Sequence, residues 1–127
     1  MSVVDEITRL LEDFDLKVEK KKNTIKAMHS ELPAYLVVKL TPSKKKAVIE
    51  LEADEELNDA LVDMIESGED VEDIVDTVIS ELRDAAIEVS RILEEKDYIV
   101  SLKLREGERD IRDQLEEVLE EYGEEEE

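Results

Sequence analysis

The side chains best suited to acid–base or nucleophilic chemistry are few in this sequence. His29 is the only histidine, and the chain contains no cysteine. A general base needs a partner that holds it in position, and no serine or carboxylate is tied to His29 by a recognisable spacing. We therefore interpret His29 as a structural or surface histidine, with a catalytic base as the alternative. The sequence predicts no catalytic residue and no cofactor.

Carboxylates, by contrast, are abundant, with 38 aspartates and glutamates in 127 residues. Dense groups occur at residues 13–15, 54–56 and 69–73. Carboxylate oxygens are the ligands that hard divalent cations prefer, but none of these groups has the spacing and central glycine of a calcium-binding loop. Helix caps and solvated helix faces explain most of them. A carboxylate-based metal protein or enzyme is the lower alternative.

Lysines are concentrated in one part of the chain. Residues 17–46 contain nine lysines and only two acidic residues, whereas the whole chain has a formal charge of −21. Two turns of the predicted sheet lie at the same end if its strands form an antiparallel meander. The lysines of these turns, which we call the lysine pole, are Lys20, Lys21, Lys22, Lys44, Lys45 and Lys46. They are either solvated turn and edge residues or a site for phosphate groups, RNA or an acidic partner.

Hydrophobic periodicity predicts four helices that must position these side chains. The longest extends from Asp70, its expected N-cap, to Glu95, with apolar residues at alternating steps of four and three. Its apolar stripe is too broad for a coiled-coil seam, so we expect it to cover a sheet. The other helices are expected at residues 3–13, 54–66 and 108–122.

Alternation of apolar and polar residues predicts five strands. They are expected at residues 14–19, 24–30, 34–41, 46–52 and 98–105. Gly107 is expected to end the last of them. The predicted order is α-β-β-β-β-α-α-β-α, which indicates an α+β fold. We expect a two-layer sandwich with a mainly antiparallel five-stranded sheet and helices on one face.

Length and composition indicate one acidic domain at residues 1–123 and a disordered acidic tail at residues 124–127. No apolar run is long enough for a membrane span, and the lack of cysteine fits a cytoplasmic protein. The charged fraction of 43% is similar to that of proteins from hot environments. The charge of −21 argues against general nucleic-acid binding, although the lysine pole keeps that alternative open.

The sheet face opposite the helices is the most informative predicted surface. Its expected apolar members are Met28, Tyr35, Val37, Val48 and Ile99. They are mixed with Lys17, Glu19, Lys26, Lys39, Glu50, Lys103 and Arg105. Such a face is either solvated, with lysines and glutamates paired across strands, or a protein interface rimmed by charge. Ile87 and Val62 are expected on outward sides of their helices and weakly indicate a further contact surface.

These patterns favour a non-enzymatic protein-interaction domain. We expect it to bind a protein partner or a second copy of itself, as a homodimer, through the open sheet face. In composition and layer architecture the chain is similar to small secretion-chaperone and adaptor proteins. Binding of an anionic ligand at the lysine pole is the main alternative. Contact between the lysine pole and an acidic helix or the acidic tail of another copy is a further alternative.

Overall fold

The computed structural model describes residues 2–123, so the predicted tail at residues 124–127 lies outside the described part. In chain order the elements are α1 (Val3–Asp13), β1 (Lys17–Lys21), β2 (Thr24–Met28), β3 (Ala34–Thr41), η1 (Pro42–Lys44), β4 (Lys46–Ala53), α2 (Leu57–Glu66), α3 (Val71–Glu95), β5 (Ile99–Lys103), α4 (Arg105–Val118) and η2 (Leu119–Gly123). The predicted α+β class and element order are confirmed.

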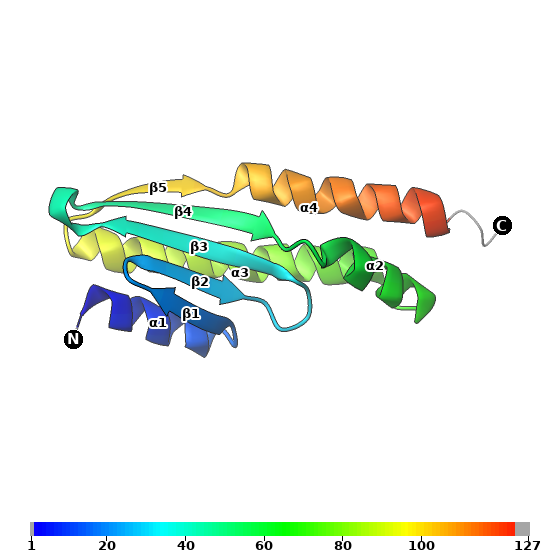
Figure 1. The fold of residues 1–127 in the computed structure, drawn as a ribbon, viewed down its shortest axis with the longest axis horizontal. Helices are drawn as coiled ribbons and strands as arrows, with labels where there is room; N and C mark the ends of the chain where they lie inside the picture. Colours follow the sequence, from blue (N-terminus) through cyan, green and yellow to red (C-terminus); the bar gives the residue numbers. More distant parts are fainter. Residues whose placement is uncertain (1, 124–127) are drawn as a thin grey trace.

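The five strands form one sheet in the order β1-β2-β3-β4-β5 (Figure 1). The first four strands pair antiparallel, as a meander with short turns. The last pair, β4 and β5, is parallel. Since α2 and α3 connect these two strands, the chain crosses the helical layer and re-enters the sheet in the same direction. In Figure 1 the sheet lies in front and α3 runs behind it.

Two helices, α1 and α3, begin where the sequence predicts, and each has a side-chain cap at its first turn. The Ser2 hydroxyl accepts a hydrogen bond from the Asp5 N–H at 3.2 Å, and the Asp70 carboxylate accepts one from the Asp73 N–H at 3.3 Å. Each cap satisfies a donor that the first turn of a helix leaves unpaired. Gly68, with a φ of 78°, lies between α2 and α3 as expected of a residue past a helix end.

Two predicted boundaries are wrong by three residues because turns occupy the expected ends. The first strand begins at Lys17 rather than at residue 14, since Phe14 caps α1 and Asp15 turns the chain with a φ of 62°. The second helix begins at Leu57 rather than at residue 54. There the Asp54 carboxylate accepts a hydrogen bond from the Glu56 N–H at 3.2 Å, which forms a side-chain turn instead of a helical one. The strand at residues 24–30 ends earlier, at Met28.

The end of β5 also differs from the prediction. The strand stops at Lys103, and α4 begins at Arg105, three residues before the expected start. Gly107 does not break a strand but lies in the first turn of α4, where an added Cβ would be 1.7 Å from the Leu51 carbonyl oxygen. The absence of a side chain therefore allows α4 to pack directly on the backbone of β4.

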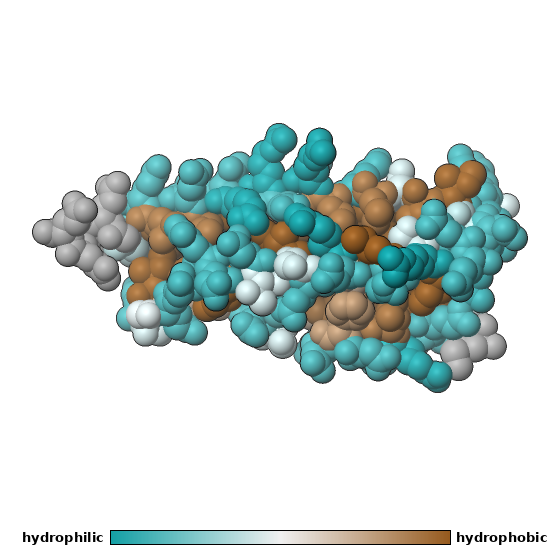
Figure 2. Space-filling model, turned by 180° about the vertical axis from the view of Figure 1, so that it is seen from behind, coloured by the Kyte–Doolittle hydropathy of each residue, from teal (hydrophilic) through white to brown (hydrophobic). Residues whose placement is uncertain are grey.

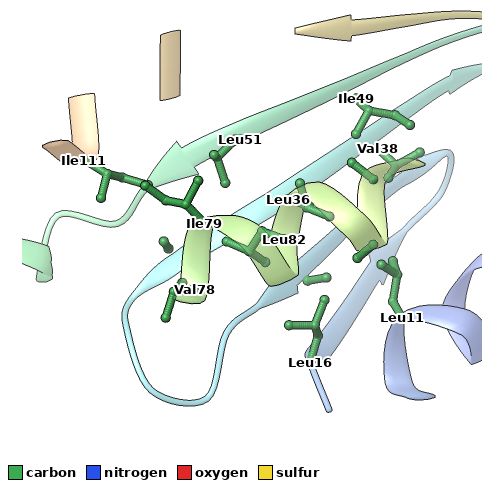
Figure 3. Close-up of a cluster of buried hydrophobic side chains, with 14 of the residues drawn as sticks. Leu11, Leu16, Leu36, Val38, Ile49, Leu51, Val78, Ile79, Leu82 and Ile111 are labelled. Carbon is green, nitrogen blue, oxygen red and sulfur yellow. The ribbon is translucent and has the colours of Figure 1, made fainter. Parts of the chain in front are cut away.

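The core lies between the sheet and α3. Figure 3 shows Val78, Ile79 and Leu82 of α3 facing the inner side chains of β3 and β4. Those strand residues are Leu36, Val38, Ile49 and Leu51. Ile111 of α4 and Leu11 of α1 belong to the same cluster, so the sheet and the helices α1, α3 and α4 share one core. The long helix is confirmed as the inner cover of the sheet.

Candidate functional site

The five predicted apolar interface residues all lie on the sheet face that no described helix covers. The register sets Met28 opposite Tyr35, and strand alternation places Val37 on the same face of β3. Val48 follows on β4 and Ile99 on β5. The residues therefore share one surface, which we call the open face.

Charged side chains divide this apolar group. The Lys39 ammonium lies 2.9 Å from the Glu50 carboxylate, between Val37 and Val48. The Lys26 ammonium lies over the Tyr35 ring, 5.2 Å from its centre. Val37 is only 2% exposed, although it faces away from α3. The expected contiguous apolar group is thus two smaller groups under long charged side chains, whose methylene stems shield the strand residues from water.

The open face is basic although the chain is acidic. By register, its charged residues are Lys17, Glu19, Lys21, Lys26, Lys39, Lys46, Glu50, Glu52 and Lys103. Six lysines and three glutamates make a charge of +3, against −21 for the chain. A cross-strand row from Glu19 through Lys26 and Glu50 to Lys103 alternates in sign around Val37. Neighbouring opposite charges of this kind stabilise a sheet face in water.

Two side chains on the open face, Lys39 and Tyr35, have raised pKa values. The hydrogen bond and charge of the Glu50 carboxylate raise the pKa of Lys39 above its usual value. Burial, followed by the neighbouring Glu52 carboxylate, raises the pKa of Tyr35. Both side chains are protonated at neutral pH even at their ordinary pKa values, and the upward shifts extend this to higher pH. The Tyr35 phenol is therefore a neutral hydrogen-bonding group on the open face.

The lysine pole is only partly assembled. The first and third turns of the meander do lie at the same end of the sheet. However, Lys20 turns toward α1, with its ammonium 3.6 Å from the Asp5 carboxylate. Lys45 donates to the Lys96 carbonyl oxygen at 3.1 Å and lies over the Tyr98 ring. The remaining four are exposed: Lys21, Lys22, Lys44 and Lys46.

A groove of about 870 Å³ borders the open face where β5 ends and α4 begins. Arg105 was expected on the sheet, but it opens α4 and lines this groove together with Lys103. Acidic residues dominate the rest of its lining: Glu50, Glu52, Glu106, Asp110, Asp113 and Glu117. The surface therefore changes from basic over the strands to acidic along α4. Sequence reasoning missed this groove because it joins two segments some fifty residues apart.

His29 has a structural environment. The residue is 8% exposed, and its ring Nδ1 accepts a hydrogen bond from the Glu31 N–H at 3.0 Å. Since Nδ1 is an acceptor, the proton of the neutral ring lies on Nε2, which donates to the Glu81 carboxylate at 2.9 Å. Both ring nitrogens are thereby used to hold the loop between β2 and β3 against α3.

The prediction of alternate burial is wrong for one residue of β5. Strand alternation with Ile99 of the open face predicts Leu102 on the helix side of β5, yet Leu102 is 46% exposed. Ile99, on the opposite face of the same strand, is 70% exposed, and Ile87 of α3 is 38% exposed as expected. Val62 is partly buried against the core. The cause is position, because β5 is the edge of the sheet and the helical layer does not extend over it fully. No sequence signal indicates that β5, which has only one charged residue, is an edge strand.

Within residues 2–123 no group of three or more histidine, aspartate or glutamate side chains is arranged to hold a metal ion. Among the same residues, no helix combines the length and apolar character needed to cross a membrane. Comparisons of the chain with models of known protein families, with curated proteins and with solved structures found no match.

Proposed function

We propose that the protein is a non-enzymatic interaction domain, adaptor- or chaperone-like, whose open face binds an acidic segment of a protein partner. The observation on which this rests is the charge of +3 on a five-stranded face of a chain with a charge of −21. That contrast concentrates attraction for anionic segments on one surface and repels them from the others.

The apolar residues of the open face support a protein rather than a simple anion as the partner. Met28 and Tyr35 are half-buried neighbours beside a pocket of about 280 Å³, which is also lined by two lysines and two carboxylates, Lys17, Lys26, Glu19 and Asp54. An interface of this kind has an apolar centre with a charged rim, and its exposed ion pairs contribute to specificity more than to affinity. Tyr35 is the only aromatic residue on the face, which offers little stacking surface for RNA bases.

Two open faces fit one another less well than an acidic partner fits one of them. Each has a charge of +3, so face-to-face contact of two copies brings like charges together. Two of the four exposed lysines of the pole, Lys21 and Lys46, lie on the same face and extend its basic end. We therefore treat the pole as part of the partner site and not as a separate anion site.

The test is recovery of bound protein from the organism's own lysate with a tagged chain and two charge-reversal variants. Lys21→Glu with Lys46→Glu changes the open face, whereas Arg9→Glu with Arg109→Glu makes the same charge change on exposed helix positions. We expect the open-face variant to recover at least tenfold less of the partner protein than the native chain, and the helix variant to recover as much as the native chain. Added salt should release the partner from the native chain.

Equal recovery by the two variants would contradict the proposal. Nuclease treatment of the lysate distinguishes the alternative. If the recovered material is nucleic acid, or is lost on nuclease treatment, the lysines bind phosphate groups instead of an acidic protein segment.

A further inference from the structure

The outer edge of β5 has unpaired backbone groups. The Ile99 N–H donates to the Lys45 carbonyl oxygen at 2.8 Å, so Ile99 directs its backbone groups toward β4. Successive residues of a strand point their N–H and C=O groups in opposite directions within the sheet. Val100 and Leu102 therefore direct theirs away from β4, where the described chain supplies no further strand.

The two edges of the sheet differ in composition. β1, the other edge, reads KVEKK, so four of its five residues are charged. β5 reads IVSLK, with a single charge at Lys103. Charged residues, lysine above all, prevent an edge strand from pairing with another chain. β1 has this protection and β5 does not.

The exposed apolar side chains gather at the same edge. Of the four large hydrophobic residues exposed among the described residues, Ile99 and Leu102 belong to β5. Ile87 lies on α3 one turn beyond Arg83, which pairs with Glu108 of α4, so it is on the side of α3 toward β5 and α4. Figure 2 shows hydrophobic side chains along the upper right edge of the molecule, where β5 runs.

We propose that β5 pairs antiparallel with β5 of a second copy, across a two-fold axis at Ser101. This register sets Val100 opposite Leu102 of the second copy, and Leu102 opposite its Val100. Since both residues direct their backbone groups outward, each of the two pairs forms two hydrogen bonds. The two five-stranded sheets become one continuous sheet of ten strands.

The side chains in this register are self-complementary, as a two-fold interface requires. Val100 and Leu102 lie on the helix side of β5, opposite Ala47 and Ile49 of β4, so the pairing buries apolar against apolar. On the other side Ile99 faces Lys103 of the second copy, whose methylene stem covers it.

The charges near the axis do not oppose a second copy as the occupant. The two Lys103 side chains are about 14 Å apart at ~3.4 Å per residue, which exceeds the screening length of ~8 Å. The pairing thus joins two edge strands that each have a charge of +1, although each whole molecule is acidic. It is independent of the partner site on the open face.

A disulfide tests the register directly, because the chain has no cysteine of its own. Ser101→Cys places two thiols opposite each other at a non-hydrogen-bonded pair, with Cα atoms ~4.5 Å apart, within disulfide range. Lys103→Cys is the matched control, since its two copies are about 14 Å apart. Under mild oxidation we expect Ser101→Cys to form covalent dimers at least tenfold faster than Lys103→Cys. Equal rates, or no dimer from Ser101→Cys, would overturn the proposal.

Analytical ultracentrifugation tests the dimer without new covalent bonds. One strand pair is smaller than a standard interface, so we expect the native chain to dissociate at micromolar concentrations, about 1–100 μM. Val100→Pro removes an outward N–H and leaves the bonds to β4 intact, and Leu102→Lys sets a charge against Val100 of the second copy. Each is expected to raise the dissociation constant at least tenfold.

Val48→Lys, on the open face of the neighbouring strand, is the control and should change that constant less than twofold. A monomer at every concentration up to ~1 mM, which corresponds to a binding free energy weaker than about −4 kcal/mol, would overturn the proposal. The proposal would also be overturned if Val100→Pro and Leu102→Lys both dimerised as well as the native chain, or if only Val48→Lys lost the dimer. If circular dichroism shows that Val100→Pro disturbs the fold, the dissociation constant of Leu102→Lys alone tests the proposal.

Discussion

Lysine side chains on the open face act as covers as well as charges. Val37 is 2% exposed without a helix above it, because Lys26 and the Lys39–Glu50 pair lie across the strand. A lysine can bury its methylene stem on apolar surface while its ammonium stays in water. A partner that binds this face must displace these stems or use them, so the ammonium positions contribute to its specificity.

The raised pKa of the Tyr35 phenol leads to a prediction for a single side chain. Burial and the Glu52 carboxylate raise its pKa, so folding favours the protonated phenol. The stability that this preference contributes is present below the ordinary pKa of 10.0 and is lost as pH rises through the higher value of the folded state. We expect Glu52→Gln to lower the pKa of Tyr35, measured as the phenolate absorbance that Tyr35→Phe removes.

Glu19→Gln removes a carboxylate from the same face that does not contribute to the shift, and it should leave the pKa of Tyr35 unchanged. A Glu52→Gln variant whose Tyr35 titrates as in the native chain would show that Glu52 does not contribute to the raised pKa.

Packing of α4 on β4 depends on one residue without a side chain. Gly107 brings the first turn of α4 onto the Leu51 carbonyl, and Ile111 one turn later enters the core. The sequence predicts a helix here from its apolar periodicity but interprets Gly107 as a strand breaker. The glycine is instead required by contact with a strand fifty-six residues earlier, which local patterns do not reveal.

Gly107→Ala is therefore expected to destabilise the fold by about 2–4 kcal/mol, since the backbone of β4 cannot yield to a Cβ at that distance. Gly68→Ala is the control, because an added Cβ there meets nothing within 4 Å and adds only the strain of a φ of 78°, roughly 1–2 kcal/mol. Urea unfolding monitored by circular dichroism measures both. A smaller loss for Gly107→Ala than for Gly68→Ala would contradict this account of the packing.

Charge is distributed unevenly over the whole molecule. The open face has a charge of +3, so the remainder of the chain has −24, mostly on the helices. The described ion pairs, such as Arg112–Asp76 at 2.8 Å, are largely exposed and contribute little each. Repulsion among unpaired carboxylates should therefore exceed attraction at neutral pH and low salt.

We predict that added sodium chloride stabilises the protein by screening this repulsion. Between ~0.01 M and ~0.5 M salt the melting temperature should rise by about 3–8 °C at pH 7. The control is the same titration near the isoelectric point of about 4.3, where the net charge is close to zero and the rise should be much smaller. A melting temperature that falls with salt at pH 7 would mean that attractive pairs outweigh the repulsion.

By itself, the sequence determined the elements and the faces of the sheet. Val71–Glu95 and Ala34–Thr41 were predictable because periodicity and alternation are local properties of a helix and a strand, and the Ser2 and Asp70 caps mark helix starts. Only the tertiary structure decided which strands pair and which side chains are covered. The parallel pairing of β5, the burial of Val37 and the exposure of Leu102 depend on contacts between residues far apart in the chain. A local pattern assigns a side chain to a face, but which strand forms the edge, and what covers that face, is set by the packing of the whole molecule.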